Sequence, residues 1–302
     1  MSSLSVLFHT VLILLWDFGW ASQCSKIHTR KEIRELSTAS RFRFIRAINQ
    51  LKRNGEYDRI TRSHNEEYPY FHRTALFFPW HRLYIRRFEQ ALQRINSDIA
   101  LPYWDWTKDA DSPADSPVFT WFGGDGRWKD GCVTSGPFAG WVVSTPNRHC
   151  LKRTFNWEDS KDLYSTPEDI NEINDSARSY HELRSLFEGQ PHGGIHHFIG
   201  GDMDETWSSN DPLFWIHHAY VDKVWWDWQN SHLSSNEYNG RTINGQSASL
   251  NDDLPKLGLQ VSQVIDIQDL CYTYSKNDEE ERQNRDEDIE EILDEIAEDE
   301  YE

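Results

Sequence analysis

The sequence predicts a mainly α-helical fold, and three stretches with apolar residues at helical spacing support that prediction. Tyr57, Ile60 and His64 follow i, i+3, i+7 spacing, and the stretches 81–95 and 214–228 repeat apolar side chains every three or four positions. Aromatic residues make up 14% of the 302 residues, enough to build one sizeable core. No internal repeat is visible, so we expect one domain with long loops between its helices.

The chain begins with a segment typical of a signal peptide. An apolar stretch runs from Leu4 to Trp16, and Gly19 and Ala21 form a small-x-small cleavage pattern. We therefore expect a signal peptide over residues 1–21 and a secreted, extracellular protein. The first residues carry no Lys or Arg, so a retained anchor is the alternative.

Four cysteines remain after the predicted cleavage site, and an even number in a secreted chain indicates two disulfides. Four cysteines allow three connectivities. The most economical pairs Cys132 with Cys150, closing a loop, and Cys24 with Cys271, tying the two ends of the domain together.

Six histidines in two groups are the most informative feature of the chain. Histidine is the commonest metal ligand, and six imidazoles without cysteine or carboxylate partners favour copper over a structural zinc ion. The alternative is that each is an ordinary core histidine with a hydrogen bond. The groups, separated by more than a hundred residues, are His64, His72 and His81, and then His192, His196 and His218.

The spacing within the second group narrows the chemistry. His192 and His196 are i and i+4, but the run is HGGIH, which lacks the glutamate of the HExxH zinc proteases. His218 lies on the apolar stripe of 214–228, whereas His217 is about 100° away from it, so His218 is the better ligand candidate. We expect His217 to make a hydrogen bond around the site instead.

Four runs of the sequence resemble the tyrosinases and other type 3 copper proteins, which include catechol oxidases and haemocyanins. The resemblance extends from about Ser37 to Gln229 and implies a four-helix bundle that carries two copper ions, with long loops. The matching runs are SHNEEYPYFHRTALFFPWHRLYIRRFEQALQ, ALPYWDWT, FEGQPHGGIHHFIGGDM and NDPLFWIHHAYVDKVWWDWQ.

The resemblance also implies an activity. His64, His72 and His81 would bind the first copper (Cu A), and His192, His196 and His218 the second (Cu B). Dioxygen, the co-substrate, would bind between them as a peroxide and oxidise monophenols, o-diphenols or both to o-quinones. The substrates would be small phenols, catechols or tyrosyl groups of proteins, in melanin formation or quinone crosslinking. A catechol oxidase without monophenol hydroxylation and a haemocyanin-like oxygen carrier are the alternatives.

Two further residues match family positions with a catalytic role. Phe214 resembles a phenylalanine that packs over a ligand ring, and Glu188 resembles a glutamate that positions a water able to deprotonate a phenol. Phe214 could equally be plain core, and Glu188 a solvated carboxylate. Two departures matter: Gly193 replaces an asparagine common in proficient hydroxylases, and Tyr70 stands where some members carry a thioether-linked cysteine.

Two segments lie outside the resemblance. Residues 111–166 are rich in Gly, Ser, Pro and Asp, and we expect a long ordered loop, pinned by a disulfide, that shapes the substrate entrance. Residues 277–302 hold fifteen acids and two arginines, so we expect a solvated, disordered tail after a copper domain of residues 22–276. This charge argues against nucleic-acid and membrane partners and would attract basic extracellular proteins.

Overall fold

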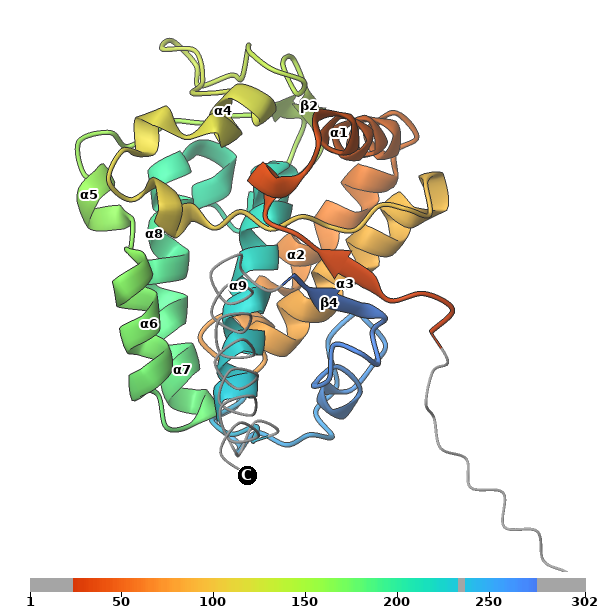
Figure 1. Ribbon diagram of the computed structural model, residues 1–302. Coiled ribbons are helices and arrows are strands. Elements are labelled where there is room, and N and C mark those ends of the chain that lie inside the picture. The colour runs from red at the N-terminus through yellow and green to blue at the C-terminus, as the bar shows by residue number, and fades with distance from the viewer. Residues whose placement is uncertain (1–23, 233–236, 276–302) are drawn as a thin grey trace, which may run out of the picture.

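Three long helices form where the apolar stripes of the sequence predict them. The computed structural model describes residues 24–232 and 237–275, and its long central helices are α2 (Glu56–Phe71), α3 (Phe77–Ile95) and α9 (Leu213–Ser231). Nearly every side chain of α9 is buried, and Figure 1 shows this helix running through the middle of the molecule. A helix that is buried on nearly all sides belongs in a core, and the fold places α9 there.

Aromatic side chains hold α3 against α9. The rings of Phe88 and Trp215 stack with their centroids 3.8 Å apart, and those of Phe78 and Trp225 stack at 5.4 Å. All four side chains are buried. Large rings contribute most of the area removed from water in such a core, so this seam fixes how the histidines on α3 and α9 face each other.

The fourth member of the bundle is a broken helix. It consists of α7 (Tyr180–Phe187), one π-helical turn η4 (Glu188–His192) and α8 (Gly193–Ile199). Pro191 lies inside the π turn and lacks the N–H that a regular helix would use there. π turns are frequent at functional sites, and this one carries Glu188 and His192. The bundle with long connections agrees with the expectation from the resemblance.

The remaining elements wrap around this bundle. Ser37 begins α1 (Thr38–Arg53), where its side chain accepts a hydrogen bond from the N–H of Ser40. The other helices are α4 (Pro117–Phe122), α5 (Ser160–Leu163) and α6 (Pro167–Ser176). The short single-turn helices are η1 (Ile33–Glu35), η2 (Trp106–Asp109), η3 (Pro113–Asp115), η5 (Gly201–Asp204), η6 (Ser208–Asn210) and η7 (Val261–Gln263).

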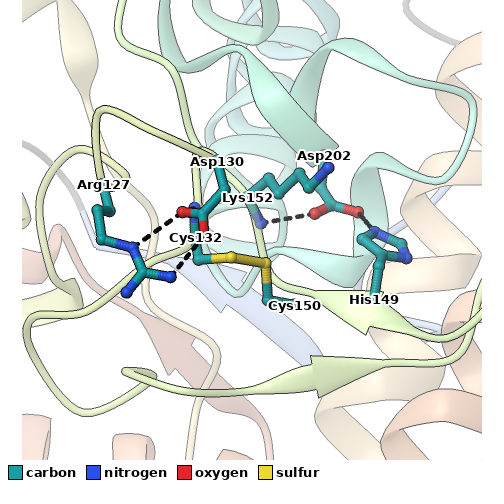
Figure 2. Close-up of a disulfide and its surroundings, with 7 residues drawn as sticks. All are labelled: Arg127, Asp130, Cys132, His149, Cys150, Lys152 and Asp202. Carbon is teal, nitrogen blue, oxygen red and sulfur yellow. Dashed lines mark hydrogen bonds and ion pairs between the residues drawn. A yellow bond between two sulfur atoms is a disulfide. The ribbon is translucent and has the colours of Figure 1, made fainter.

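Two small sheets coincide with the two disulfides. Strand β2 (Val142–Val143) pairs antiparallel with β3 (His149–Cys150), beside the bond between Cys132 and Cys150 shown in Figure 2. Strand β1 (His28–Arg30) pairs in parallel with β4 (Tyr272–Tyr274), beside the bond between Cys24 and Cys271. Both predicted disulfides are therefore confirmed. The first pins the segment 111–166, as expected.

Buried ion pairs join β1 to the bundle. The Arg30 guanidinium lies 2.7 Å from Glu89 and 3.2 Å from Asp222, and Arg82 lies 2.5 Å from Asp222. All four side chains are inaccessible to solvent or nearly so. Buried charges are tolerated when each is paired and hydrogen-bonded, as these are.

No helix within 24–232 or 237–275 is long and apolar enough to cross a membrane. The predicted signal peptide (1–21) and acidic tail (277–302) lie outside the described residues. Those assignments and the predicted domain boundaries stay predictions.

Candidate metal centre

The first three predicted histidines converge in the structure. His64 lies on α2, His81 lies on α3, and His72 is the residue directly after α2. One ring nitrogen from each lies within 4.8 Å of those of the other two. Three nitrogens gathered this closely suit a single metal ion with open coordination positions.

The second group converges in the same way, with one addition. His192, His196, His217 and His218 each offer a ring nitrogen within 4.8 Å of the others. The predicted set contained His218 and not His217. The Nε2 atom of His218 lies 3.2 Å from that of His196, whereas no hydrogen-bond contact joins His217 to a neighbour in the described part of the chain.

The two histidine groups face each other across α3 and α9. The rings of His81 and His218 stack with their centroids 4.2 Å apart, and those of His72 and His192 lie 5.9 Å apart. A metal in each group would therefore have the other as its neighbour. This is the arrangement of a binuclear centre.

The hydrogen bonds of the imidazoles leave their Nε2 atoms available. A carbonyl oxygen only accepts, so each Nδ1 that contacts one must carry the proton, and Nε2 is then the atom with the lone pair. The Nδ1 contacts are His64 to Thr206 at 2.9 Å, His81 to Phe77 at 2.8 Å, His192 to Glu188 at 2.9 Å and His196 to Met203 at 2.6 Å.

Several of these Nε2 atoms are buried hydrogen-bond acceptors without a partner among the described residues. Those of His64, His81 and His192 have no hydrogen-bond partner among the described residues. A buried polar atom without a partner costs roughly 1–3 kcal/mol. Three of them aimed into one space fit a soft or borderline metal ion, so the residues present suit the two copper ions that the resemblance implied.

Burial keeps these imidazoles neutral. Desolvation lowers the pKa of His196 to about 4, and it lowers the pKa values of His64, His81, His192 and His218 well below the ordinary value of 6.5. A metal must compete with protons for a lone pair, and here that competition is weak at neutral pH.

One expectation from the sequence is wrong in detail. His217 was expected to make a hydrogen bond, but both its ring nitrogens lack a partner in the described ranges, and its ring stacks on His192 instead. His72 is the one histidine of the first group that lies on no helix. It lies beyond the end of α2 with extended backbone (φ −74°, ψ 138°), because the chain must turn sharply at Arg73 (φ 59°) to enter α3.

Glu188 stabilises that turn. One carboxylate oxygen accepts from the Arg73 N–H at 2.6 Å and lies 3.2 Å from Nδ1 of His72, while the other pairs with the Arg184 guanidinium at 2.5 Å. Both oxygens are therefore engaged by the protein. A carboxylate on the distal nitrogen of a metal-binding histidine fixes the ring and raises its basicity, which is a role in orienting His72.

We expect Glu188→Gln to lower copper affinity at the first histidine group by about 10- to 100-fold, the usual cost of losing such a partner. Its physical cause is the loss of the charge that holds His72 and Arg184. Copper titration of the apoprotein measures it. Glu205→Gln is the control, because Glu205 lines the same cavity without a hydrogen bond to any histidine of the described part. Loss of monophenol turnover alone, with copper affinity unchanged, would instead favour the predicted role in deprotonating a phenol.

Phe214 lies where the sequence predicted it. Its buried ring covers that of His218 with the centroids 4.1 Å apart and meets His64 edge-on at 5.0 Å. The contact restrains both rings, and its part in catalysis stays a prediction.

A cavity of about 570 Å³ opens onto the histidines. His72, His192 and His196 line it, together with Glu188 and Gly193. No residue of the segment 111–166 lines it, so the expectation that this segment shapes the entrance is wrong. The segment covers another side of the bundle, where Phe119, Phe122 and Phe138 are buried.

Asp202, a residue that the sequence analysis did not single out, links the segment 111–166 to the residues around the histidines. This buried carboxylate lies 2.8 Å from Nε2 of His149 and accepts from the Lys152 N–H at 2.7 Å, beside the disulfide (Figure 2). The next residue along, Met203, supplies the carbonyl that orients His196. Asp202 belongs to the GGDM run that matches the family, but nothing in the spacing of that run suggested a role at a metal site.

Comparison with known proteins agrees with this geometry. The family model described as the common central domain of tyrosinase matches residues 54–231. A tyrosinase of Streptomyces glaucescens is 34% identical over 234 residues, covering 68% of this chain and 84% of that protein. The tyrosinase ustQ of Aspergillus flavus is 34% identical over 289 residues, covering 83% and 80%.

Solved structures share the fold. A mutant polyphenol oxidase from Thermothelomyces thermophila superposes with a TM-score of 0.72 at 24% identity, covering 83% of this chain and 89% of that one. A functional unit of octopus hemocyanin gives 0.61 at 20% identity, covering 82% and 68%. These structures confirm the predicted fold class, a mainly α-helical domain of the di-copper type.

Proposed function

Because the chain belongs to the tyrosinase family, we propose that it is a copper-dependent phenol oxidase that converts o-diphenols to o-quinones with dioxygen. The observation that carries this proposal is the set of buried, partnerless Nε2 atoms in two facing histidine groups. In the proposal His64, His72 and His81 hold one copper, and His192, His196 and His218 hold the other. Bound there, the two ions would accept electrons from the phenol and be the place where dioxygen is reduced.

The residues of the chain provide binding and orientation. The cavity has room for an aromatic ring beside His72, His192 and His196, which line it. Tyr68, whose ring lies 4.2 Å from that of His72, offers the incoming ring an aromatic wall. Each o-diphenol gives up two electrons and two protons, so two diphenols reduce one dioxygen to two waters.

We also propose that the enzyme is secreted. Two disulfides in one domain are typical of an oxidising compartment, and the sequence begins with the pattern of a signal peptide. Measuring the mature N-terminus of the secreted chain tests this, because cleavage after Ala21 gives Ser22 as the first residue.

Hydroxylation of monophenols depends on Gly193 in this proposal. A side chain at Gly193 would meet only the Glu188 carbonyl oxygen, 3.7 Å from the added Cβ, and the backbone there is helical (φ −65°). Asparagine therefore fits without strain. We expect Gly193→Asn to raise the ratio of monophenol to diphenol turnover by about tenfold, the value of one added hydrogen bond of ~1.4 kcal/mol.

Oxygen uptake by the copper-loaded chain, on a monophenol and the matching diphenol, measures this ratio. Gly189→Asn is the control, since it adds the same amide to the same cavity at a position where the added Cβ meets no atom within 4 Å. An unchanged ratio in Gly193→Asn would contradict the expectation. Reversible oxygen binding without turnover of either substrate would favour an oxygen carrier and overturn the proposed function.

A further inference from the structure

The cavity at the histidines adjoins a second one. This second cavity, of about 540 Å³, shares Arg73 and Arg184 with the first and extends to Arg241. A third, shallower hollow adjoins both and contains Arg178. We call the surface formed by Arg73, Arg178, Arg184 and Arg241 the basic groove. Each cavity alone is as large as a small-molecule site, about 300–1,000 Å³, so a small catechol needs only the first.

The charge of the basic groove differs from that of the chain as a whole. The full sequence has a formal net charge of −19. Among the described residues, no ion pair neutralises Arg73, Arg178 or Arg241, and all three side chains are exposed. Arg184 is the paired member, because it holds Glu188. The second and third cavities have one carboxylate in their described walls, Glu182, which accepts from the N–H of Arg178.

Negative and positive side chains are distributed unevenly along the cavities. Arg73 follows His72 directly, so the groove begins at the edge of the metal centre. Asp204 and Glu205 line the same first cavity without contributing to the second. A ring seated above the histidines would thus have its anionic neighbours drawn toward Arg73 and Arg241 and repelled from Asp204. Exposed guanidinium groups bind carboxylates in this way, often through two parallel hydrogen bonds.

We propose that the substrate is a phenolic side chain within an acidic peptide segment, with its ring in the first cavity and its neighbouring carboxylates in the basic groove. The proposal rests on the proposed function and names its substrate class. The reaction is unchanged: each peptidyl o-diphenol loses two electrons and two protons and becomes a peptidyl o-quinone. Dioxygen receives four electrons from two such groups and leaves as two waters.

Three matched peptides test the proposal. Each carries one central dihydroxyphenylalanine, so that the result does not depend on hydroxylation, and its flanking residues are Glu, Gln or Lys. We expect the KM of the Glu peptide to be about tenfold below that of the Gln peptide at low salt, as two or three exposed ion pairs would give. The Lys peptide should have the highest KM. The difference should shrink near 1 M salt, where charges are screened beyond about 3 Å.

Substitutions of the groove arginines test whether the preference for the Glu peptide arises in the basic groove. Arg241→Gln and Arg178→Gln should each raise the KM of the Glu peptide by about two- to threefold, and the double variant by the product. The ratio of kcat/KM for the Glu peptide to that for 4-methylcatechol should fall by the same factors. Arg46→Gln is the matched control: Arg46 is exposed on α1, at the top of Figure 1, whereas α7 lies at the lower left.

The outcomes separate the two proposals. Absence of oxygen uptake with 4-methylcatechol would overturn the proposed function itself. Normal catechol turnover with equal KM values for the Glu and Gln peptides would overturn only the substrate class. A preference for Glu that appears only after the chain is shortened at Asn277 would assign the groove to the chain's own acidic segment, and that result would also overturn the proposal.

Discussion

Replacing His218 with alanine is expected to remove one copper ion per chain and to lower diphenol turnover by more than about a hundredfold. This is a larger loss than removing a residue that only hydrogen-bonds a metal ligand would cause. The reason is that its Nε2 atom lies 3.2 Å from that of His196, at the point where the two histidine groups meet. Metal analysis of the purified variant gives the copper content, and oxygen uptake gives the turnover.

His217→Ala is the matched control for this variant. His217 and His218 are neighbours on α9, and both are fully buried, so truncation leaves a similar hole in each case. We expect His217→Ala to keep two copper ions per chain. Copper loss in His217→Ala with two ions retained in His218→Ala would reverse the assignment, since His217 also offers a nitrogen within 4.8 Å of the group.

Local periodicity was enough to predict the central helices and most of the histidine positions. Tyr57, Ile60 and His64 share one face of α2, and the face of α3 that contains His81 packs on α9. Burial of an apolar stripe decides where such a helix lies, so side chains on the stripe point inward together. This is why histidines on separate helices meet, although the sequence does not give the distances between them.

The features that sequence reasoning missed depend on contacts between distant segments. His72 leaves the helix because Glu188, 116 residues later, holds its ring and the turn that follows. Asp202 reaches His149, 53 residues earlier. The basic groove likewise combines α7 with Arg241 and the turn at Arg73. No periodic pattern records such pairings, because each is made by a single side chain whose partner is fixed only by the tertiary fold.

The pairing of β1 with the bundle leads to the second large expected effect, which concerns stability. Asp222 lies one helical turn after His218 and holds two arginines: Arg82 at 2.5 Å and Arg30 at 3.2 Å. Asp222→Asn would leave the buried Arg82 guanidinium without a carboxylate partner among the described residues, and would remove one of the two carboxylates beside Arg30, which keeps Glu89. Breaking a buried pair in this way costs about 3–5 kcal/mol, so we expect the free energy of unfolding to fall by that amount in a urea titration.

Asp98→Asn is the control, because Asp98 forms an ion pair with Lys26 at 2.9 Å in which both side chains are largely exposed, and we expect its unfolding curve to match that of the native chain.

The pH dependence of the free energy of unfolding provides a second readout. Burial raises the pKa of Asp222, but Arg82 and Arg30 outweigh this and hold it below its ordinary value of 3.8. A lowered pKa in the folded state means that the pair stabilises the fold above pH 3.8 and that this contribution is lost as the pH falls below that value. Asp222→Asn should therefore lose less stability than the native chain between pH 5 and pH 3, whereas an equal loss in both would show that Asp222 is not the carboxylate that the two arginines stabilise.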